Sequence, residues 1–146
     1  MRRVLALDVG DKRIGVAVSD PLGITAQGIE TYTRTGDTEK DAEHIAELAK
    51  KYEPVRLLFG MPRNMDGSYG FQSEKVKEFA QAVLKVWDGE HAFFDERLTT
   101  VSAERVLVEA DMDWRKRRKV VDKLAATIIL QGYLDYLNMH REVEEV

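Results

Sequence analysis

Three acidic side chains stand at positions where a charge is unexpected. Asp8 lies inside the apolar run VLALDV, and Glu96 follows closely on the apolar run HAFF, residues 91–94. Asp122 lies one helical turn before an apolar stripe that contains Ala126 and Ile129, so it should face the interior of the protein. Carboxylates that are packed together repel one another, and a bound divalent cation removes that repulsion.

The residue types favour magnesium or manganese over zinc at such a site. The chain has no cysteine and only three histidines, whereas carboxylate oxygens are ligands that Mg²⁺ prefers. Two such ions roughly 4 Å apart can activate a water molecule and stabilise the leaving oxygen in phosphodiester hydrolysis. The residues therefore indicate a candidate metal centre that would suit phosphodiester chemistry.

Each of the three acidic residues also has a simpler explanation. Asp8 could end a strand and begin a turn, and Asp122 could cap the N-terminus of a helix. Glu96 could be a surface residue that pairs with its neighbour Arg97. The joint occurrence of all three in one small chain favours the metal centre, but the residues alone leave both interpretations open.

The elements that would position these side chains follow from the spacing of the apolar residues. Residues 4–7 and 13–20 predict two strands, and the short turn between them makes the pair antiparallel. A third strand should span residues 25–33, and a helix should begin near Thr38, which with Asp41 resembles a capping box, and end at Pro54. Strands are then expected at 55–60 and 91–94, and helices near 76–87, 102–110 and 119–140.

This order of elements predicts an α/β fold in which a mixed five-stranded sheet is flanked by helices, with three antiparallel strands before the alternating part. The 146 residues suit a single domain over 1–146, with 139–146 as a frayed tail. No apolar run approaches the roughly 20 residues that span a bilayer, and the N-terminal run is too short for a secretory signal. We therefore expect a cytoplasmic protein.

Two glycines flank the predicted first turn. Gly10 and Gly15 could serve the turn itself, because glycine adopts positive φ angles without strain. They could also let a phosphate group approach the backbone beside Asp8. Both interpretations remain open from the sequence.

A basic segment suggests a polyanionic substrate. The stretch WRKRRK, residues 114–119, places five cations after one aromatic residue, although the net charge of the chain is −4. Trp114 could stack on an unpaired base or simply anchor a solvated loop. The segment leads directly into Asp122, and this adjacency favours the first interpretation.

The loop GMPRNMDGS, residues 60–68, lies between a buried strand and a helix, where α/β folds often bind ligands. Arg63 and Asn64 could contact a phosphate or a sugar, whereas Ser68 could merely cap the helix. The predicted substrate-binding residues are Lys12, Arg13, Arg63, Asn64, Arg97, Trp114, Arg115, Lys116, Arg117, Arg118 and Lys123.

Four segments of the chain resemble the signature segments of the YqgF family, also called RuvX. They are, in order, LALDVGDKRIGVAVSDPLGITAQGIET, GMPRNMDGS, DERLTT and DKLAATIILQGYLD. The resemblance implies an RNase H-like fold and maps the family's acidic positions onto Asp8, Glu96 and Asp122, with Asp95 as the alternative for the middle position. Relatives often carry proline at the position of Gly28.

The resemblance also implies a function, namely metal-dependent cleavage of phosphodiester bonds in structured nucleic acid. The expected cofactor is Mg²⁺ or Mn²⁺, with two ions bound. The first expectation is processing of the 5′ end of precursor 16S rRNA in ribosome biogenesis, and the second is cleavage of Holliday junctions in branched DNA. A homodimer would suit a four-way junction, and a monomer would suit end trimming.

Two functions of other classes compete with the nuclease. A non-catalytic nucleic-acid-binding module could assist ribosome assembly or transcription. An ATPase of the actin or sugar-kinase type also has an early aspartate and glycines between two strands, but it needs two lobes, whereas 146 residues supply one.

Overall fold

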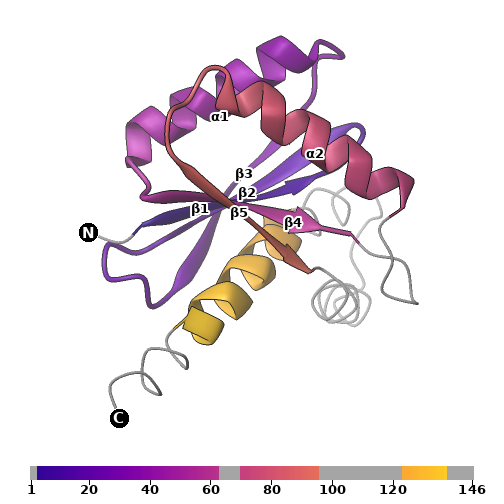
Figure 1. The fold of residues 1–146 in the computed structure, drawn as a ribbon. Helices are drawn as coiled ribbons and strands as arrows, with labels where there is room; N and C mark the ends of the chain where they lie inside the picture. Colours follow the sequence, from indigo (N-terminus) through magenta and orange to yellow (C-terminus); the bar gives the residue numbers. More distant parts are fainter. Residues whose placement is uncertain (1–2, 63–69, 96–122, 138–146) are drawn as a thin grey trace.

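The computed structural model describes residues 3–62, 70–95 and 123–137 (Figure 1). Within these residues no helix is both long enough and apolar enough to cross a membrane. The labelled elements are β1 (Val4–Val9), β2 (Arg13–Ser19), β3 (Ala26–Thr33), α1 (Thr38–Tyr52), β4 (Arg56–Met61), α2 (Phe71–Leu84) and β5 (Glu90–Asp95). A further helix, which carries no label in the figure, covers residues 123–137.

The strands form one mixed five-stranded sheet in the order β3-β2-β1-β4-β5. β1 pairs with β2 in antiparallel orientation and with β4 in parallel orientation, and β5 continues the sheet parallel to β4. The predicted α/β architecture is therefore confirmed, including the three antiparallel strands at the start. The predicted helix at 102–110 and the predicted tail at 139–146 lie outside the described residues.

Helices cover both faces of the sheet: α1 and α2 lie on one face, and the 123–137 helix lies on the other (Figure 1). The side chains of β1 pack alternately against the helices on the two faces of the sheet, because successive residues of a strand point to opposite faces. Leu5 and Leu7 belong to the apolar cluster that α1 and α2 complete, whereas Val4 and Ala6 belong to the cluster of the 123–137 helix. The central strand is thus buried on both sides.

The 123–137 helix is tied to β3 and β5 by side chains of its own. Gln131 accepts a hydrogen bond from the Ala26 N–H at 3.0 Å and donates one to the Ile24 carbonyl at 3.0 Å. The ring of Tyr133 packs edge-on against Phe94, with 5.9 Å between the centroids. The apolar stripe predicted for this helix, which contains Ala126, Ile129 and Tyr133, is buried.

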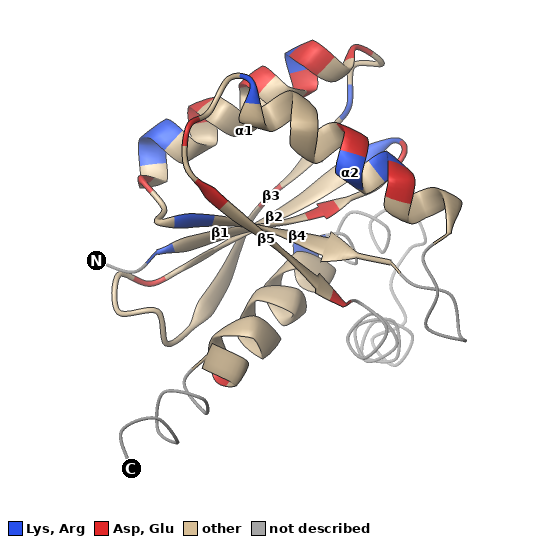
Figure 2. Cartoon of the chain, viewed as in Figure 1, with Lys and Arg blue, Asp and Glu red and all other residues tan. Residues whose placement is uncertain are grey.

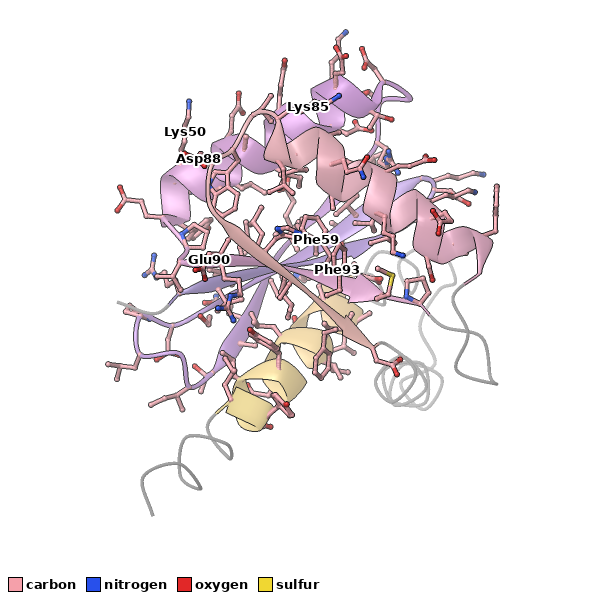
Figure 3. All side chains as sticks on the ribbon, viewed as in Figure 1. Lys50, Phe59, Lys85, Asp88, Glu90 and Phe93 are labelled. Carbon is pink, nitrogen blue, oxygen red and sulfur yellow. The ribbon has the colours of Figure 1, made fainter. Side chains whose placement is uncertain are left out.

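On the other face, aromatic contacts hold the edge strand β5 against β4. The rings of Phe59 and Phe93 have centroids 5.7 Å apart (Figure 3). At the start of both strands, Arg56 forms an ion pair with Glu90 at 3.0 Å. These contacts, together with the parallel ladder, fix where β5 ends relative to β4.

A β-bulge in β3 changes which face its side chains occupy. Ala17 of β2 pairs with Gly28, whereas the preceding Val16 pairs with Glu30, so Ile29 is the additional residue. Gly28, like its partner Ala17, lies on the face of the 123–137 helix. After the bulge, Tyr32 packs with the cluster beneath α1 and α2. The sequence pattern gave no indication of this change.

The capping box expected at Thr38 and Asp41 is wrong. The N-cap of α1 is Asp37, whose side chain accepts a hydrogen bond from the Glu39 N–H at 3.0 Å. Asp41 is instead completely buried, because it faces the sheet one turn into the helix. There it meets donors from the segment that follows the bulge.

Asp41 is surrounded by hydrogen-bond donors. Its carboxylate accepts from the Tyr32 hydroxyl at 2.9 Å, from Arg34 Nε at 2.9 Å and from both the N–H and the hydroxyl of Thr35 at 3.0 Å. Burial by itself would raise the pKa of Asp41, but the hydrogen bonds from Thr35, Arg34 and Tyr32 together hold the pKa below its usual value of 3.8.

We expect Asp41→Asn to lower the free energy of unfolding by about 2–4 kcal/mol, because the amide leaves the partly buried Arg34 guanidinium without its counter-charge and accepts fewer of the buried hydrogen bonds. Urea denaturation at neutral pH measures the loss. The matched control is Asp37→Asn, four residues earlier, since asparagine caps a helix as well as aspartate does. Equal stability of the two variants would contradict the structural role of Asp41.

The Asp41 network should also make stability depend on pH. Because the pKa of Asp41 is lower in the folded than in the unfolded state, its contribution is present above the unfolded pKa and is lost as the pH falls through the folded pKa. The difference in unfolding free energy between wild type and Asp41→Asn should therefore stay constant from neutral pH to about pH 5 and narrow towards pH 3. A difference that is unchanged over this range would refute the assignment.

Candidate active site

Asp8 lies near the carboxyl end of the central strand β1. It is half-buried and pairs with Gly15 of β2. Because strand residues alternate, Asp8 shares the face of Val4 and Ala6, which is the face covered by the 123–137 helix. The strand predicted over residues 4–7 is confirmed, and it extends to Val9, so that it includes Asp8.

The positions beside Asp8 on both neighbouring strands are glycines. Gly15 is its partner on β2, and on β4 Gly60 follows Phe59, the partner of Leu7. Neither position contributes a side chain over the carboxylate. A half-buried carboxylate at the carboxyl end of a central strand is an oxygen donor of the kind that a hard divalent cation prefers.

The parallel strands β1, β4 and β5 bring their carboxyl ends to the same edge of the sheet. Asp95 ends β5 at this edge and pairs with Met61. Met61 belongs to the cluster beneath α1 and α2, so Asp95 lies on the face opposite Asp8. This placement disfavours Asp95 as a partner of Asp8. Glu96 and Asp122 lie outside the described residues.

The turn that follows Asp8 requires a glycine for a local reason. The Gly10 N–H donates to the Arg13 carbonyl at 2.8 Å, and a Cβ atom on Gly10 would lie 2.8 Å from that same oxygen. Turn geometry therefore accounts for Gly10. Whether a phosphate also approaches this turn stays a prediction.

Arg34 holds the same turn from outside the strand pair, and the sequence analysis missed it. Its NH1 group donates to the Gly10 carbonyl at 3.0 Å, while its Nε binds the buried carboxylate of Asp41. The guanidinium carbon also lies 5.0 Å from the centroid of the Phe79 ring of α2. No local signal could have revealed Arg34, because Gly10 and Phe79 are far from it in the sequence.

Three of the predicted substrate-binding cations lie in the described part of the chain. Lys12 is exposed in the turn after β1, and Arg13 begins β2 two residues before Gly15, hence on the face of Asp8. Lys123 is exposed at the start of the described helix. The others lie outside the described residues: Arg63, Asn64, Arg97, Trp114, Arg115, Lys116, Arg117 and Arg118.

Charge elsewhere on the described surface is mixed. Acidic and basic residues alternate on the outward faces of α1 and α2 (Figure 2). Near the first turn, Lys75 forms an ion pair with Asp11 at 2.9 Å, and this contact lowers the pKa of Asp11. Within residues 3–62, 70–95 and 123–137, no three acidic or histidine side chains gather as a complete ligand set.

The sequence was compared with models of known protein families. The family model described as "RuvX: Holliday junction resolvase" matches residues 2–136. A relative from Clostridium perfringens is 52% identical over 136 residues, which is 93% of this chain and 98% of the relative. A relative from Halothermothrix orenii is 53% identical over 136 residues, which is 93% of this chain and 96% of the relative. Both are named "Putative pre-16S rRNA nuclease".

Solved structures support the fold. RuvC from Thermus thermophilus in complex with a Holliday junction substrate has a TM-score of 0.60 and 15% identity, over 96% of this chain and 97% of that one. A second RuvC structure from the same organism has a TM-score of 0.54 and 14% identity, over 94% of this chain and 96% of that one. The fold is thus RNase H-like. From the match over nearly its whole length and the identity to these relatives, the chain belongs to the RuvX family.

Proposed function

We propose that this chain is a metal-dependent endonuclease that processes the 5′ end of precursor 16S rRNA. The observation that carries the proposal is the position of Asp8, half-buried at the carboxyl end of the central strand with a glycine beside it on each neighbouring strand. Relatives more than 50% identical over nearly their whole length are named for this RNA, which supports the choice of substrate.

The proposed metal ligands are Asp8, Glu96 and Asp122. We assign the middle position to Glu96 because Asp95, the alternative, lies on the face of the sheet opposite Asp8. The bound ions, Mg²⁺ or Mn²⁺ and most simply two, would supply neutralisation of phosphate charge and activation of the attacking water. The oxygen-only donor set suits these ions better than zinc.

Residues around Asp8 would keep its carboxylate in position and bind the phosphates of the substrate. The ladder with β2 pairs Asp8 with Gly15, and the ladder with β4 reaches the preceding Leu7, so the backbone that carries the carboxylate would need little reorganisation when a phosphate arrives. Lys12 and Arg13 at the same edge would bind neighbouring phosphates, and the basic segment 114–119 would bind the backbone further away. Arg34 would keep the turn that carries Lys12 in place.

A four-way DNA junction is the second candidate substrate. The family description names Holliday junction resolvase activity, and one RuvC structure with a similar fold holds a junction. Phosphate contacts alone do not separate the two nucleic acids, since both present the same charged backbone. A homodimer would favour the junction, because a junction has two equivalent strands to cut.

The decisive variant is Asp8→Asn, which keeps the size of the side chain and removes its charge. We expect it to reduce Mg²⁺-dependent or Mn²⁺-dependent cleavage of precursor 16S rRNA at least about 100-fold, because a neutral amide binds a divalent cation poorly. RNA binding, measured by fluorescence anisotropy, should persist. Labelled precursor 16S rRNA and a labelled four-way junction should be assayed side by side, and chelation by EDTA should abolish the wild-type activity.

Asp11→Asn is the matched control. Asp11 lies three residues further along, is exposed and pairs with Lys75, so its loss should change cleavage less than about twofold. If wild type cuts only the junction, the substrate assignment is wrong. If both proteins bind but neither cuts, the chain is a binding module, and if Asp8→Asn cuts as fast as wild type, Asp8 is not part of the active site.

A further inference from the structure

Gly28 of β3 lies directly under the first described turn of the 123–137 helix. A Cβ atom at this position would lie 2.6 Å from Cγ of Lys123, 3.2 Å from its Cδ and 2.8 Å from the Thr127 hydroxyl oxygen. Carbon atoms of different side chains pack at about 3.5–4.0 Å, so a separation of 2.6 Å is a steric clash. The stem of Lys123 therefore occupies the space that any other residue at position 28 would fill.

The bulge in β3 brings Gly28 to this place. Because Ile29 is the additional residue, Gly28 pairs with Ala17 on the face of the 123–137 helix, and Ala17 in turn pairs with Ala6. Three small residues thus lie side by side under the helix. Asp8 is two residues beyond Ala6 on the same face, roughly 12 Å from Gly28 between Cα atoms by standard strand spacings.

Lys123 is well placed to act on a ligand rather than on the protein. Its side chain is exposed, and within the described residues no carboxylate forms an ion pair with it. The Thr127 hydroxyl donates to the Lys123 carbonyl at 2.8 Å and so fixes the turn from which the side chain starts. With its stem packed over Gly28, the side chain keeps fewer rotamers than a free surface lysine does.

We propose that Gly28 is a positioning residue for the nuclease site: it gives room to the stem of Lys123, which thereby presents its ammonium group to a phosphate of the strand bound at Asp8. The inference rests on the proposed function, in which Lys123 contacts the substrate. A side chain at position 28 would force Lys123 into another rotamer and move its ammonium group away, without touching the substrate itself.

The test measures nucleic-acid binding as a function of salt, in proteins that all carry Asp8→Asn so that cleavage does not interfere. The probe is a labelled fragment of precursor 16S rRNA that spans the 5′ processing site. A lost phosphate contact reduces the slope of log K against log salt by about 0.7 to 0.9. We expect Gly28→Ala to show this reduction, with affinity about three- to tenfold lower at low salt.

The matched control is Gly132→Ala, which adds the same methyl group to the same helix–sheet interface. Its Cβ atom would meet Phe94 at 3.5 Å, an ordinary contact, and would lie far from Lys123 along the helix. The salt slope of this variant should equal that of the parent. A reduced slope in both variants would show a general loss of packing and would overturn the proposal.

A double-mutant cycle with Lys123→Met shows whether Gly28 acts through Lys123, because methionine keeps an unbranched stem without the charge. Lys123→Met alone should lower the slope as Gly28→Ala does, and Gly28→Ala should change nothing further in that background. Additive effects would mean that Gly28 acts by another route. An unchanged slope in Gly28→Ala, or no binding of the RNA by the parent protein at low salt, would likewise overturn the proposal.

Folding is checked by circular dichroism before each titration. If Gly28→Ala does not fold, Gly28→Ala combined with Thr127→Ala removes the contact at 2.8 Å and keeps the one with Lys123 at 2.6 Å. Its slope is compared with that of Thr127→Ala alone, which lacks the same hydrogen bond to the Lys123 carbonyl, and the same reduction is expected. Cleavage by proteins with Asp8 intact separates the two proposals. If Asp8→Asn loses metal-dependent cleavage but Gly28→Ala leaves the salt slope unchanged, only the role of Gly28 is refuted. If Gly28→Ala reduces the salt slope but the wild-type protein cuts nothing, only the nuclease activity is refuted.

Discussion

The burial of β1 on both faces is the constraint on which the structure depends. Leu5 and Leu7 enter the cluster beneath α1 and α2, and Ala6 enters the cluster beneath the 123–137 helix. A shift of one residue against either neighbouring strand would move every one of these side chains to the wrong layer, so the register is strongly specified. The register that fills the core therefore also decides where the strand ends, and Asp8 is at that end.

The carboxylates of Asp41 and Asp8 differ in how far they are buried and in which groups surround them. Asp41 is completely buried, and the protein itself neutralises it with Arg34, Tyr32 and Thr35. Asp8 is half-buried at the carboxyl end of the central strand, where the directly adjacent position on each neighbouring strand is a glycine. The first arrangement stabilises the fold, whereas the second fits the metal-binding role proposed for Asp8. Arg34 connects them, because it also binds the turn after β1.

The strands, the first hairpin and the helices with a clear apolar stripe were predictable from the sequence, since periods of 2 and 3.6 residues are local signals. The segment containing Asp8 was recognisable for the same reason, as a charge that interrupts an apolar run. The motifs then identified the family, and the match over residues 2–136 confirmed it. The sequence left the choice between Asp95 and Glu96 open, because a short edge strand does not reveal its own face.

The sequence by itself determined the order of the elements, the family and the position of Asp8 at the end of the first strand. Only the tertiary structure decided the bulge at Ile29, the burial of Asp41, the face of Asp95 and the packing of Lys123 over Gly28. The physical reason is that each of these features depends on packing between elements. The face of Asp95 and the packing of Lys123 over Gly28 join segments far apart in the sequence, and Asp41 is buried only because its helix packs on the sheet, whereas helix and strand periods are written into neighbouring residues.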